Sequence, residues 1–328
     1  MEVRRHLVMF TLLVASANVF AAPLTVVNPG FEDLHFGNLP GIYNGDVPPT
    51  AFPTGSAPTG WASFGTVGGG ASIGVLNPGI LASEPLATFF PAGAPEGDNV
   101  ALTFFNAFQG GPEFGIQQTL ADTLQPRTTY TLTVEVGNIA SGTSAEPILY
   151  AGFGFFDLRG FPGYRIDLLA GGNVIASDNS TLLPSEGEFL TSTVQVDIGD
   201  NVVPGQALSI RLVNLNVQDV NEGAVDLEVD FDDVQLDASP LVSADFDEDD
   251  DIDGRDFLTW QAGFGGGPLL SEGNADGDAD VDADDLLVWE QMYGTPPALA
   301  AFTTVPEPSS AYLLCLVLAG VLGRRRER

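Results

Sequence analysis

Apolar and polar residues alternate along much of residues 23–236, in short runs separated by glycine and proline. A period of two places successive side chains on opposite faces of a strand, so each run predicts a strand with one buried face. Many such strands with turn residues between them predict a mainly β fold, an antiparallel jelly-roll β-sandwich over residues 22–240. The clear runs are Tyr130, Leu132, Val134 and Val136; Val194, Val196 and Ile198; Leu208, Ile210 and Leu212; and, strongest of all, Val225, Leu227, Val229 and Phe231 before Val234 and Leu236.

Beyond residue 241 the spacing of apolar residues changes to that of two short helices. Two sets of three apolar residues stand at i, i+3 and i+7, which places each set on one helix face. The sets lie 29 residues apart, and each precedes a glycine that we expect to end the helix. Residues 241–295 therefore predict a small α module with duplicated halves. The sets are Phe257, Trp260 and Phe264 before Gly265, and Leu286, Trp289 and Tyr293 before Gly294.

Acidic residues precede each of these helices at the spacing of a twelve-residue calcium loop. Positions 1, 3, 5, 9 and 12 supply side-chain oxygens to the cation, and position 7 supplies its backbone carbonyl. An acidic solvated tail is the alternative, but it has no reason to repeat in register. We therefore predict two Ca²⁺ sites. The loop residues are Asp245, Asp247, Asp249, Asp251, Asp253 and Asp256 in the first copy, and Asn274, Asp276, Asp278, Asp280, Asp282 and Asp285 in the second.

Two loop positions carry further expectations. Position 8 is normally apolar and joins the two loops by a short β-bridge, a role that suits Ile252 and Val281. Position 6 is usually glycine because the backbone there takes a positive φ. This chain has Asp250 and Ala279 instead, and we expect the Ala279 loop to bind its cation more weakly.

Two such EF-hand-like loops, each followed by a short helix, resemble a type I dockerin module over residues 243–295. The resemblance implies a module that folds around calcium and docks onto a cohesin-like receptor protein.

The two ends of the chain predict export. Residues 1–21 combine Arg4 and Arg5, an apolar run and small residues before Ala21, as in a secretory signal peptide. A linker over 296–304 leads to a tail, residues 305–328, with an apolar segment at 311–322 and a basic end at 324–328. Its motif Val305, Pro306, Glu307 and Pro308 resembles the PEP-CTERM sorting signal, which implies an exosortase that releases the protein to the cell surface or matrix. A retained C-terminal membrane anchor is the alternative.

The sandwich also resembles a family, on four short motifs. They are Asn28-Pro29-Gly30-Phe31-Glu32, Gly60-Trp61, Gly97-Asp98-Asn99-Val100-Ala101-Leu102 and Phe231-Asp232-Asp233-Val234. These are similar to the galactose-binding-like jelly rolls that include many carbohydrate-binding modules. The resemblance implies that Glu32, Asp232 and Asp233 hold a third, structural calcium, because first and last strands lie side by side. Exposed carboxylates beside a strand end are the alternative.

Sugar binding would need aromatic side chains presented outward as platforms. The candidates could equally belong to the core, which we favour for each of them and for Trp61, because phenylalanine is more often buried. The candidates are Tyr43, Tyr150, Phe153, Phe155, Phe156, Phe161 and Tyr164.

Charge and composition narrow the partners. A net charge of −33 over 328 residues repels nucleic acid and anionic lipid, so the membrane is expected to matter only through the tail. The single cysteine, Cys315, lies in the apolar tail, and His6 and His35 are the only histidines, which argues against disulfides, zinc sites and most catalytic arrangements.

These observations together predict a non-catalytic, calcium-binding, exported protein of the cell surface or extracellular matrix, associated with polysaccharide through its sandwich. A polysaccharide hydrolase is one alternative, for which two carboxylates among Asp98, Glu113, Glu135 and Asp157 would have to face each other across a cleft. A structural scaffold without a small ligand is the other.

Overall fold

The computed structural model describes residues 21–34, 41–43, 56–67, 70–78, 89–105, 112–143, 155–203, 205–217 and 227–294. Its described residues fall into two compact units that divide between Leu241 and Val242. Residues 1–20 of the predicted leader, the linker and the sorting tail lie outside this part of the chain, as do Val225, Tyr150 and Phe153.

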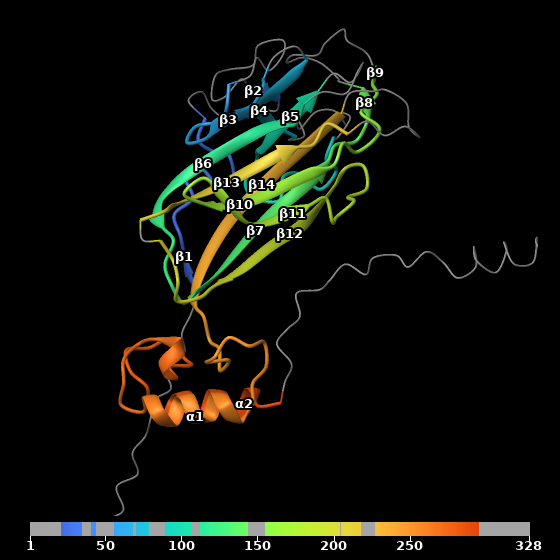
Figure 1. Cartoon of the computed structure of the whole chain (residues 1–328). Coiled ribbons are helices and arrows are strands. Elements are labelled where there is room, and N and C mark those ends of the chain that lie inside the picture. Colours follow the sequence, from blue (N-terminus) through green and yellow to red (C-terminus); the bar gives the residue numbers. More distant parts are fainter. Residues whose placement is uncertain are drawn as a thin grey trace, which may run out of the picture. The chain divides into compact units, whose positions relative to one another are not determined.

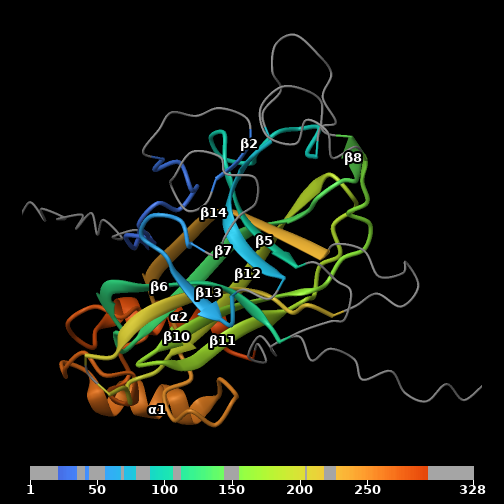
Figure 2. The same ribbon diagram turned by 90° about the horizontal axis from the view of Figure 1, so that it is seen from above.

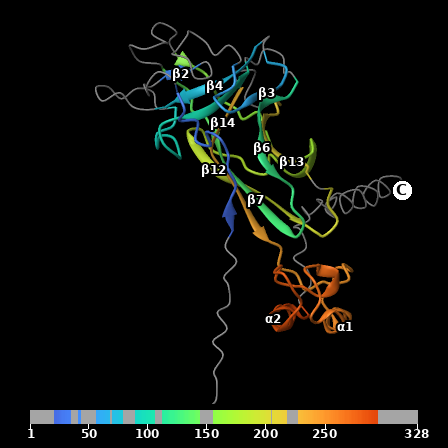
Figure 3. The ribbon, with the colours of Figure 1, turned by 90° about the vertical axis from the view of Figure 1, so that its left-hand side faces the viewer.

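The first unit is built from two antiparallel sheets, which confirms the mainly β prediction and is consistent with a β-sandwich (Figure 1). Figure 3 shows β6 and β13 in one layer and β12 and β14 in the other. The seven-stranded sheet has the order β12 (Glu188–Ile198), β7 (Thr128–Asn138), β14 (Leu227–Pro240), β5 (Val100–Phe105), β4 (Ala71–Asn77) and β2 (Gly41–Tyr43), with β1 (Ala22–Pro23) paired to β14. The five-stranded sheet has the order β11 (Asn173–Asn179), β10 (Tyr164–Ala170), β13 (Ala207–Asn214), β6 (Phe114–Thr123) and β3 (Ala62–Gly65). A separate two-stranded ribbon joins β8 (Gly142–Thr143) to β9 (Phe155–Phe156).

The main core lies between the two sheets and is made by the alternating residues that the sequence singled out. Leu132, Val134 and Val136 of β7 are fully buried there, as are Leu208, Ile210 and Leu212 of β13. Trp61 is also buried, with its ring 5.5 Å from that of Phe31, so it is a core residue. Removing this apolar surface from water is the main favourable contribution to the stability of the sandwich.

Strand β14 occupies the middle of the seven-stranded sheet, between β5 and β7 (Figure 2). It pairs with β1 at its far end, through Ala22 opposite Ala238, so the first and last strands lie side by side as expected. Its register with β7 shifts between Asp232 and Gln235, where Asp233 takes a positive φ of 46°. This bulge lies next to the acidic residues that the sequence placed at a metal site.

A buried polar network connects the two sheets. The hydroxyl of Tyr164 on β10 and that of Ser192 on β12 both donate to Oδ2 of Asp178 on β11. Burial and the bond to Asp178 raise the pKa of Tyr164 to about 12. Burial alone opposes ionisation of Asp178, but its hydrogen bonds from Ser192, Tyr164 and Thr181 outweigh burial and lower its pKa on balance. In this network Asp178 is therefore an ionised acceptor whose hydrogen bonds compensate for its burial.

The second unit contains α1 (Gly254–Gly263), the 3₁₀ helix η1 (Leu270–Glu272) and α2 (Ala283–Met292). Asp253 and Asp282 cap α1 and α2 by the same capping box, which satisfies backbone N–H groups of the first turn. Gly265 and Gly294 follow the helices with φ of 80° and 71°, as predicted for their ends.

Hydrogen bonds between the two halves of this unit are reciprocal. The indole Nε1 of Trp260 donates to the carbonyl of Asp282 (2.7 Å), and that of Trp289 donates to the carbonyl of Asp253 (3.1 Å). The N–H groups of Gly265 and Gly294 likewise reach the position-8 carbonyls of the opposite loops. Within the described residues these bonds take the place of the β-bridge that we expected between Ile252 and Val281.

Replacing Asp178 with alanine should destabilise the sandwich, because the hydroxyls of Tyr164 and Ser192 would lose their buried acceptor, at a cost of about 1–3 kcal/mol each. Urea unfolding followed by circular dichroism measures this change. Asp197→Ala is the matched control: Asp197 and its hydrogen bond from Thr129 are exposed to solvent, so a change within about 0.5 kcal/mol is expected. Equal effects of the two substitutions would contradict a stabilising role for the network.

Candidate active site and metal sites

Three carboxylates alternate along the outer face of β14, the face turned away from the main core. Glu228, Asp230 and Asp232 point to this side because Leu227, Val229 and Phe231 point the other way. All three acids are nevertheless buried, and Asp230 and Asp232 are 0% exposed. The expectation that the polar faces of the strands meet solvent is therefore wrong for β14. We call these residues the β14 acid row.

Apolar side chains surround this part of the sheet. Asp230 lies opposite Leu102 of β5 on one side and Gly137 of β7 on the other. Leu102 belongs to a second hydrophobic cluster, separate from the main core, which we call the outer cluster. It contains Leu76, Phe90, Val100, Leu102, Ile139 and Leu158, with Phe89, Ala94, Phe104 and Phe189 packed against it.

Asp230 is placed to be a neutral acid. Among the described residues, no amide, hydroxyl or guanidinium group donates a hydrogen bond to either of its carboxylate oxygens. Burial, and then the charge of Glu228, raise the pKa of Asp230 well above its usual value. Two ionised carboxylates can only accept, so a hydrogen bond between Asp230 and Glu228 requires a shared proton. A protonated carboxyl in apolar surroundings can act as a general acid.

A second group of carboxylates lies where the N-terminal segment meets the bulge of β14. Oε1 of Glu32 accepts the backbone N–H groups of Asp98 and Asn99, both at 2.7 Å, and Oε2 accepts Nδ2 of Asn99. Oδ2 of Asp232 accepts the backbone N–H of Glu96 (2.9 Å). Because Glu96 and Asn99 belong to one loop, this loop holds Glu32 and Asp232 near each other.

This group fits a divalent cation. A Cβ at Gly97 would clash with Glu32, and one at Gly30 would clash with the carboxylate of Glu96, so glycine at both positions lets the acids approach. Oδ1 of Asp232 is buried and has no partner within the described part of the chain, and burial raises the pKa of Asp232 to about 8. An orphaned carboxylate oxygen beside two further carboxylates suits a hard cation such as Ca²⁺.

Asp233, the third residue of the predicted sandwich site, has a different partner for its side chain, although its charge contributes to the raised pKa of Glu96. Its Oδ1 accepts a hydrogen bond from Nε2 of Gln235 (2.6 Å). The structure thus brings Glu32 and Asp232 together and adds Glu96, which the sequence analysis did not select.

The first predicted calcium loop brings its acids together. Carboxylate oxygens of Asp245, Asp247 and Asp249 lie within 4.8 Å of one another, and those of Asp251, Asp253 and Asp256 do the same. These are the only such triads in the described ranges. Asp256, at position 12, is buried and accepts the N–H groups of Phe246 and Asp253, both at 2.7 Å.

The second loop has the same plan with an amide at position 1. Asp285 is buried like Asp256 and accepts the N–H groups of Ala275 and Asp282. Nδ2 of Asn274 donates to the carbonyl of Asp280, the position-7 oxygen that a calcium loop offers to its cation (3.0 Å). The pKa of Asp280 is raised, mainly by the negative charge of Asp278, then by burial and by the charge of Asp282. Mutual repulsion of this kind is what a bound cation relieves.

Backbone conformation corrects the expectation for position 6. Asp250 has a positive φ of 70°, as predicted, but Ala279 does not. Position 4 takes a positive φ in both loops, 55° at Glu248 and 80° at Gly277. The alanine is therefore free of the strain from which we inferred weaker binding.

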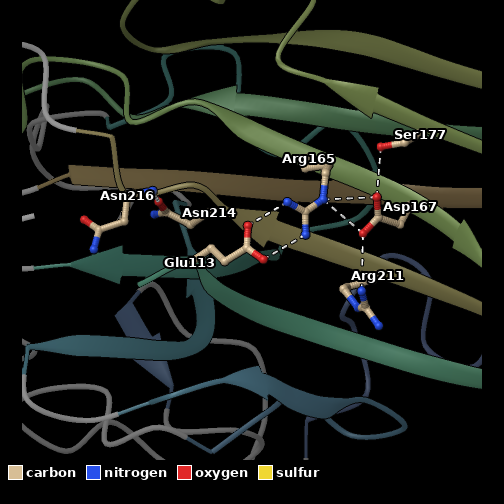
Figure 4. A network of polar contacts seen from close by, with 7 residues as sticks. All are labelled: Glu113, Arg165, Asp167, Ser177, Arg211, Asn214 and Asn216. Atoms are coloured by element: carbon tan, nitrogen blue, oxygen red, sulfur yellow. Dashed lines mark hydrogen bonds and ion pairs between the residues drawn. The ribbon is translucent and has the colours of Figure 1, made fainter. Parts of the chain in front are cut away.

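The four acids considered for a hydrolase do not form a facing pair. Glu113 makes two hydrogen bonds to the guanidinium of Arg165, which also contacts the buried Asp167 (Figure 4). The bond from Arg165 lowers the pKa of Glu113, which makes it a poor proton donor at neutral pH. Asp157 pairs with Arg159, Glu135 accepts the hydroxyl of Thr191, and the backbone of Asp98 donates to Glu32.

The aromatic residues considered as sugar platforms are buried or partly buried where the structure describes them. Tyr164 is fully buried, and Phe161 packs against the main core. Tyr43, Phe155 and Phe156 lie in β2 and β9, and their side chains are outside the described part, as are Tyr150 and Phe153.

Comparison with known proteins gives matches for two parts of the chain. Residues 22–237 match the HpiC1-like family, described as HpiC1 cyclase, and residues 304–326 match the PEP-CTERM protein-sorting motif. A crystal structure of the Stig cyclase Fisc from Fischerella sp. TAU, in complex with (3Z)-3-(1-methyl-2-pyrrolidinylidene)-3H-indole, is 31% identical with a TM-score of 0.50, covering 67% of this chain and 99% of that chain. A structure of a cyclase from Fischerella sp. TAU in complex with 4-(1H-indol-3-yl)butan-2-one is 32% identical with a TM-score of 0.50, covering 68% and 100%. No curated protein matches the chain.

These matches overturn the prediction of a non-catalytic calcium-binding protein, because the matched family and solved structures are cyclases. The same matches argue against the hydrolase and scaffold alternatives. They give no support for polysaccharide or a cohesin-like receptor as a partner. The candidate acid is one residue of a single strand, desolvated by its surroundings, and not one of two carboxylates that face each other across a cleft.

The predicted PEP-CTERM motif is confirmed. The PEP-CTERM motif supports an exported, surface-sorted protein and implies processing by an exosortase. No helix within the described residues is long and apolar enough to cross a membrane.

Asp230 and Glu228 were not among the residues predicted from the sequence, although the sequence contains a signal for them. Residues 227–232 read Leu-Glu-Val-Asp-Phe-Asp, with an acid at every polar position of the most apolar strand. A strand in the middle of a sheet that lies beneath a second cluster has no solvent-facing side, so acids there are exceptional.

The ion pair of Glu113 predicts a pH-dependent contribution to stability. Because Arg165 lowers the pKa of Glu113 below its usual 4.5, the contribution is present above about pH 4.5 and is lost as pH falls through the lowered folded value. The difference in unfolding free energy between the wild type and Glu113→Gln should therefore shrink from pH 6 to pH 3, as measured by urea unfolding. A difference that grows toward pH 3 would contradict the assignment.

Proposed function

The chain belongs to the HpiC1-like cyclase family, and we propose that its sandwich catalyses an acid-initiated cyclisation in which Asp230 is the proton donor. The observation that carries this proposal is a fully buried carboxyl that accepts no hydrogen bond from an amide, hydroxyl or guanidinium group of the described residues and lies beside an apolar and aromatic cluster. Such a group lowers the stability of the fold, since a hydrophobic residue would fill the same place more favourably. Its presence therefore points to a function.

The chemistry balances without an oxidant or reductant. The carboxyl of Asp230 gives its proton to an unsaturated or basic atom of the substrate, which leaves a carboxylate and a substrate cation. A nucleophilic π bond of the same substrate attacks the cation and closes a ring through a new carbon–carbon bond. Loss of a proton from the ring product returns the carboxyl to its starting state. The net reaction is an isomerisation, so substrate and product have equal mass.

The surroundings of Asp230 favour an apolar, aromatic substrate. The outer cluster offers leucine, isoleucine, valine and phenylalanine side chains, and apolar sites with few polar groups select ligands by shape and aromatic contact. The two Fischerella structures contain indole compounds. We therefore propose an indole compound with an unsaturated side chain as the substrate class.

We also propose a structural Ca²⁺ held by Glu32, Glu96 and Asp232. A cation there would neutralise the orphaned carboxylate of Asp232 and tie the N-terminal segment and the 96–99 loop to β14. The residues around it have no part in the proton transfer that we assign to Asp230.

For the second unit we propose a dockerin-like module, residues 241–295, that binds Ca²⁺ in its two loops. The support is the register of the two copies, the acidic triads of the first loop and the reciprocal contacts of Trp260 and Trp289. We likewise keep the jelly-roll description of the sandwich as a proposal.

Asp230→Asn tests the proposed donor. The amide keeps the shape of the side chain but cannot supply the acid proton, so turnover should fall by a factor of about 10²–10⁴, the usual contribution of general acid catalysis. The full chain is incubated with indoles that carry an alkenyl side chain, and products of unchanged mass are separated and counted by mass spectrometry.

Asp197→Asn, an exposed change on the same sheet, is the control and should leave turnover unchanged. Binding of 4-(1H-indol-3-yl)butan-2-one, followed by NMR, should survive in both variants, which shows that the site is still folded. Undiminished turnover by the asparagine variant at 230 would refute the assignment.

Calcium removal tests the second unit. If its loops fold around the cation, a chelator should remove the helical circular dichroism signal of this unit, whereas the sandwich, which also loses its proposed cation, should stay folded with a lower melting temperature. Asp245→Ala together with Asp249→Ala should remove one site from a calorimetric calcium titration of the full chain. An unchanged stoichiometry would show that these residues are not the ligands. Asp284→Ala, at a partly exposed acid outside the predicted ligand set, serves as the control.

A further inference from the structure

The ring of Phe189 lies directly over a glycine in the middle of the sheet. Phe189 of β12 is paired with Gly137 of β7. A Cβ placed on Gly137 would lie 2.5, 2.7 and 3.0 Å from Cε1, Cζ and Cδ1 of the Phe189 ring. Real Cβ atoms essentially never approach a neighbour this closely, so the ring occupies space that any other residue at 137 would fill.

Gly137 is also the residue opposite Asp230. The three strands lie in the order β12, β7, β14, and Gly137 pairs with Phe189 on one side and with Asp230 on the other. Neighbouring strands are about 4.8 Å apart, so the Cα atoms of Phe189 and Asp230 are separated by about two such spacings. Because the side chain of Phe189 extends over Gly137, its ring spans about half of this separation. It therefore stands one strand spacing from the acid, on the same face of the sheet.

The ring is held there from its other side by Phe90. The two ring centroids are 4.4 Å apart with an interplanar angle of 37°. The segment that carries Phe90 is itself attached to the sheet, since the N–H of Ala140 donates to the carbonyl of Phe89 (3.0 Å). Phe90 is fully buried, whereas Phe189 is only partly buried. Phe90 thus fixes the position of the Phe189 ring, and the remaining surface of that ring is accessible.

Resting on the proposed function, we propose that Phe189 is the aromatic wall of the reaction site, and that it stabilises the positive charge formed on the substrate beside Asp230. The face of a benzene ring attracts a cation within about 6 Å of its centroid, and the attraction is largest where water is excluded. A leucine in its place would keep the apolar contact but lose this attraction. Gly137 is the positioning residue, because its missing side chain admits the ring.

The test compares a neutral and a cationic probe of nearly equal shape. The neutral probe is 4-(1H-indol-3-yl)butan-2-one, and the cationic probe is the corresponding primary amine, an ammonium ion at neutral pH. Dissociation constants of both are measured by calorimetry with the full chain, for the wild type, Phe189→Leu, Phe189→Tyr and Gly137→Ala. Phe64→Leu, an aromatic change on the five-stranded sheet, is the control, and melting temperatures report on folding.

Phe189→Leu should weaken binding of the amine by about tenfold relative to the ketone, the size expected of a desolvated cation–π contact. Phe189→Tyr, which keeps the ring, should restore the ratio, and Gly137→Ala should lower it by displacing the ring. An unchanged ratio in Phe189→Leu, with Asp230→Asn still inactive, would overturn the role of Phe189 and leave the proposed function standing. Absence of binding of either probe by the wild type would instead overturn the proposed function itself.

Discussion

Desolvation of one strand is the constraint on which the sandwich and its site depend. β14 lies in the middle of the larger sheet, and its two faces meet two different hydrophobic clusters. An acid on such a strand has no water to stabilise its charge, so it must be neutral, paired or bound to a cation. The acids of the β14 acid row differ in this respect. Asp230 lies beside Glu228 and has a raised pKa, which favours its neutral form, whereas Asp232 belongs to a group of carboxylates that suits a cation.

The strands and the duplicated loops could be read from the sequence because each depends on local periodicity. Alternation in 130–136 and 208–212 is a property of neighbouring residues, and the 29-residue repeat of acids and aromatics is visible without knowing any contact. The capping boxes at Asp253 and Asp282 follow from the same local pattern.

The active-site candidate could not be read in this way, because it depends on contacts between distant segments. Period-two alternation shows that Asp230 faces away from Phe231, but it does not show that Phe90, Leu102 and Leu158 belong to a cluster on that same face. The role of Gly137 could not be predicted from the sequence either. Only the pairing of β12, β7 and β14 shows that the ring of Phe189 occupies the space that a side chain at 137 would take. The same holds for Glu96, whose place beside Glu32 and Asp232 depends on the conformation of the loop and on Gly30 and Gly97.

The reciprocal bonds of Trp260 and Trp289 have a consequence for how the second unit came to exist. Each indole is satisfied by a carbonyl of the opposite repeat, so one repeat alone would leave an indole N–H and a carbonyl unpaired. Two separate chains of one repeat each could satisfy these groups in the same way, as a symmetric homodimer. The present arrangement is what gene duplication and fusion of such a dimer would produce, with the symmetry of the ancestral assembly preserved inside one chain.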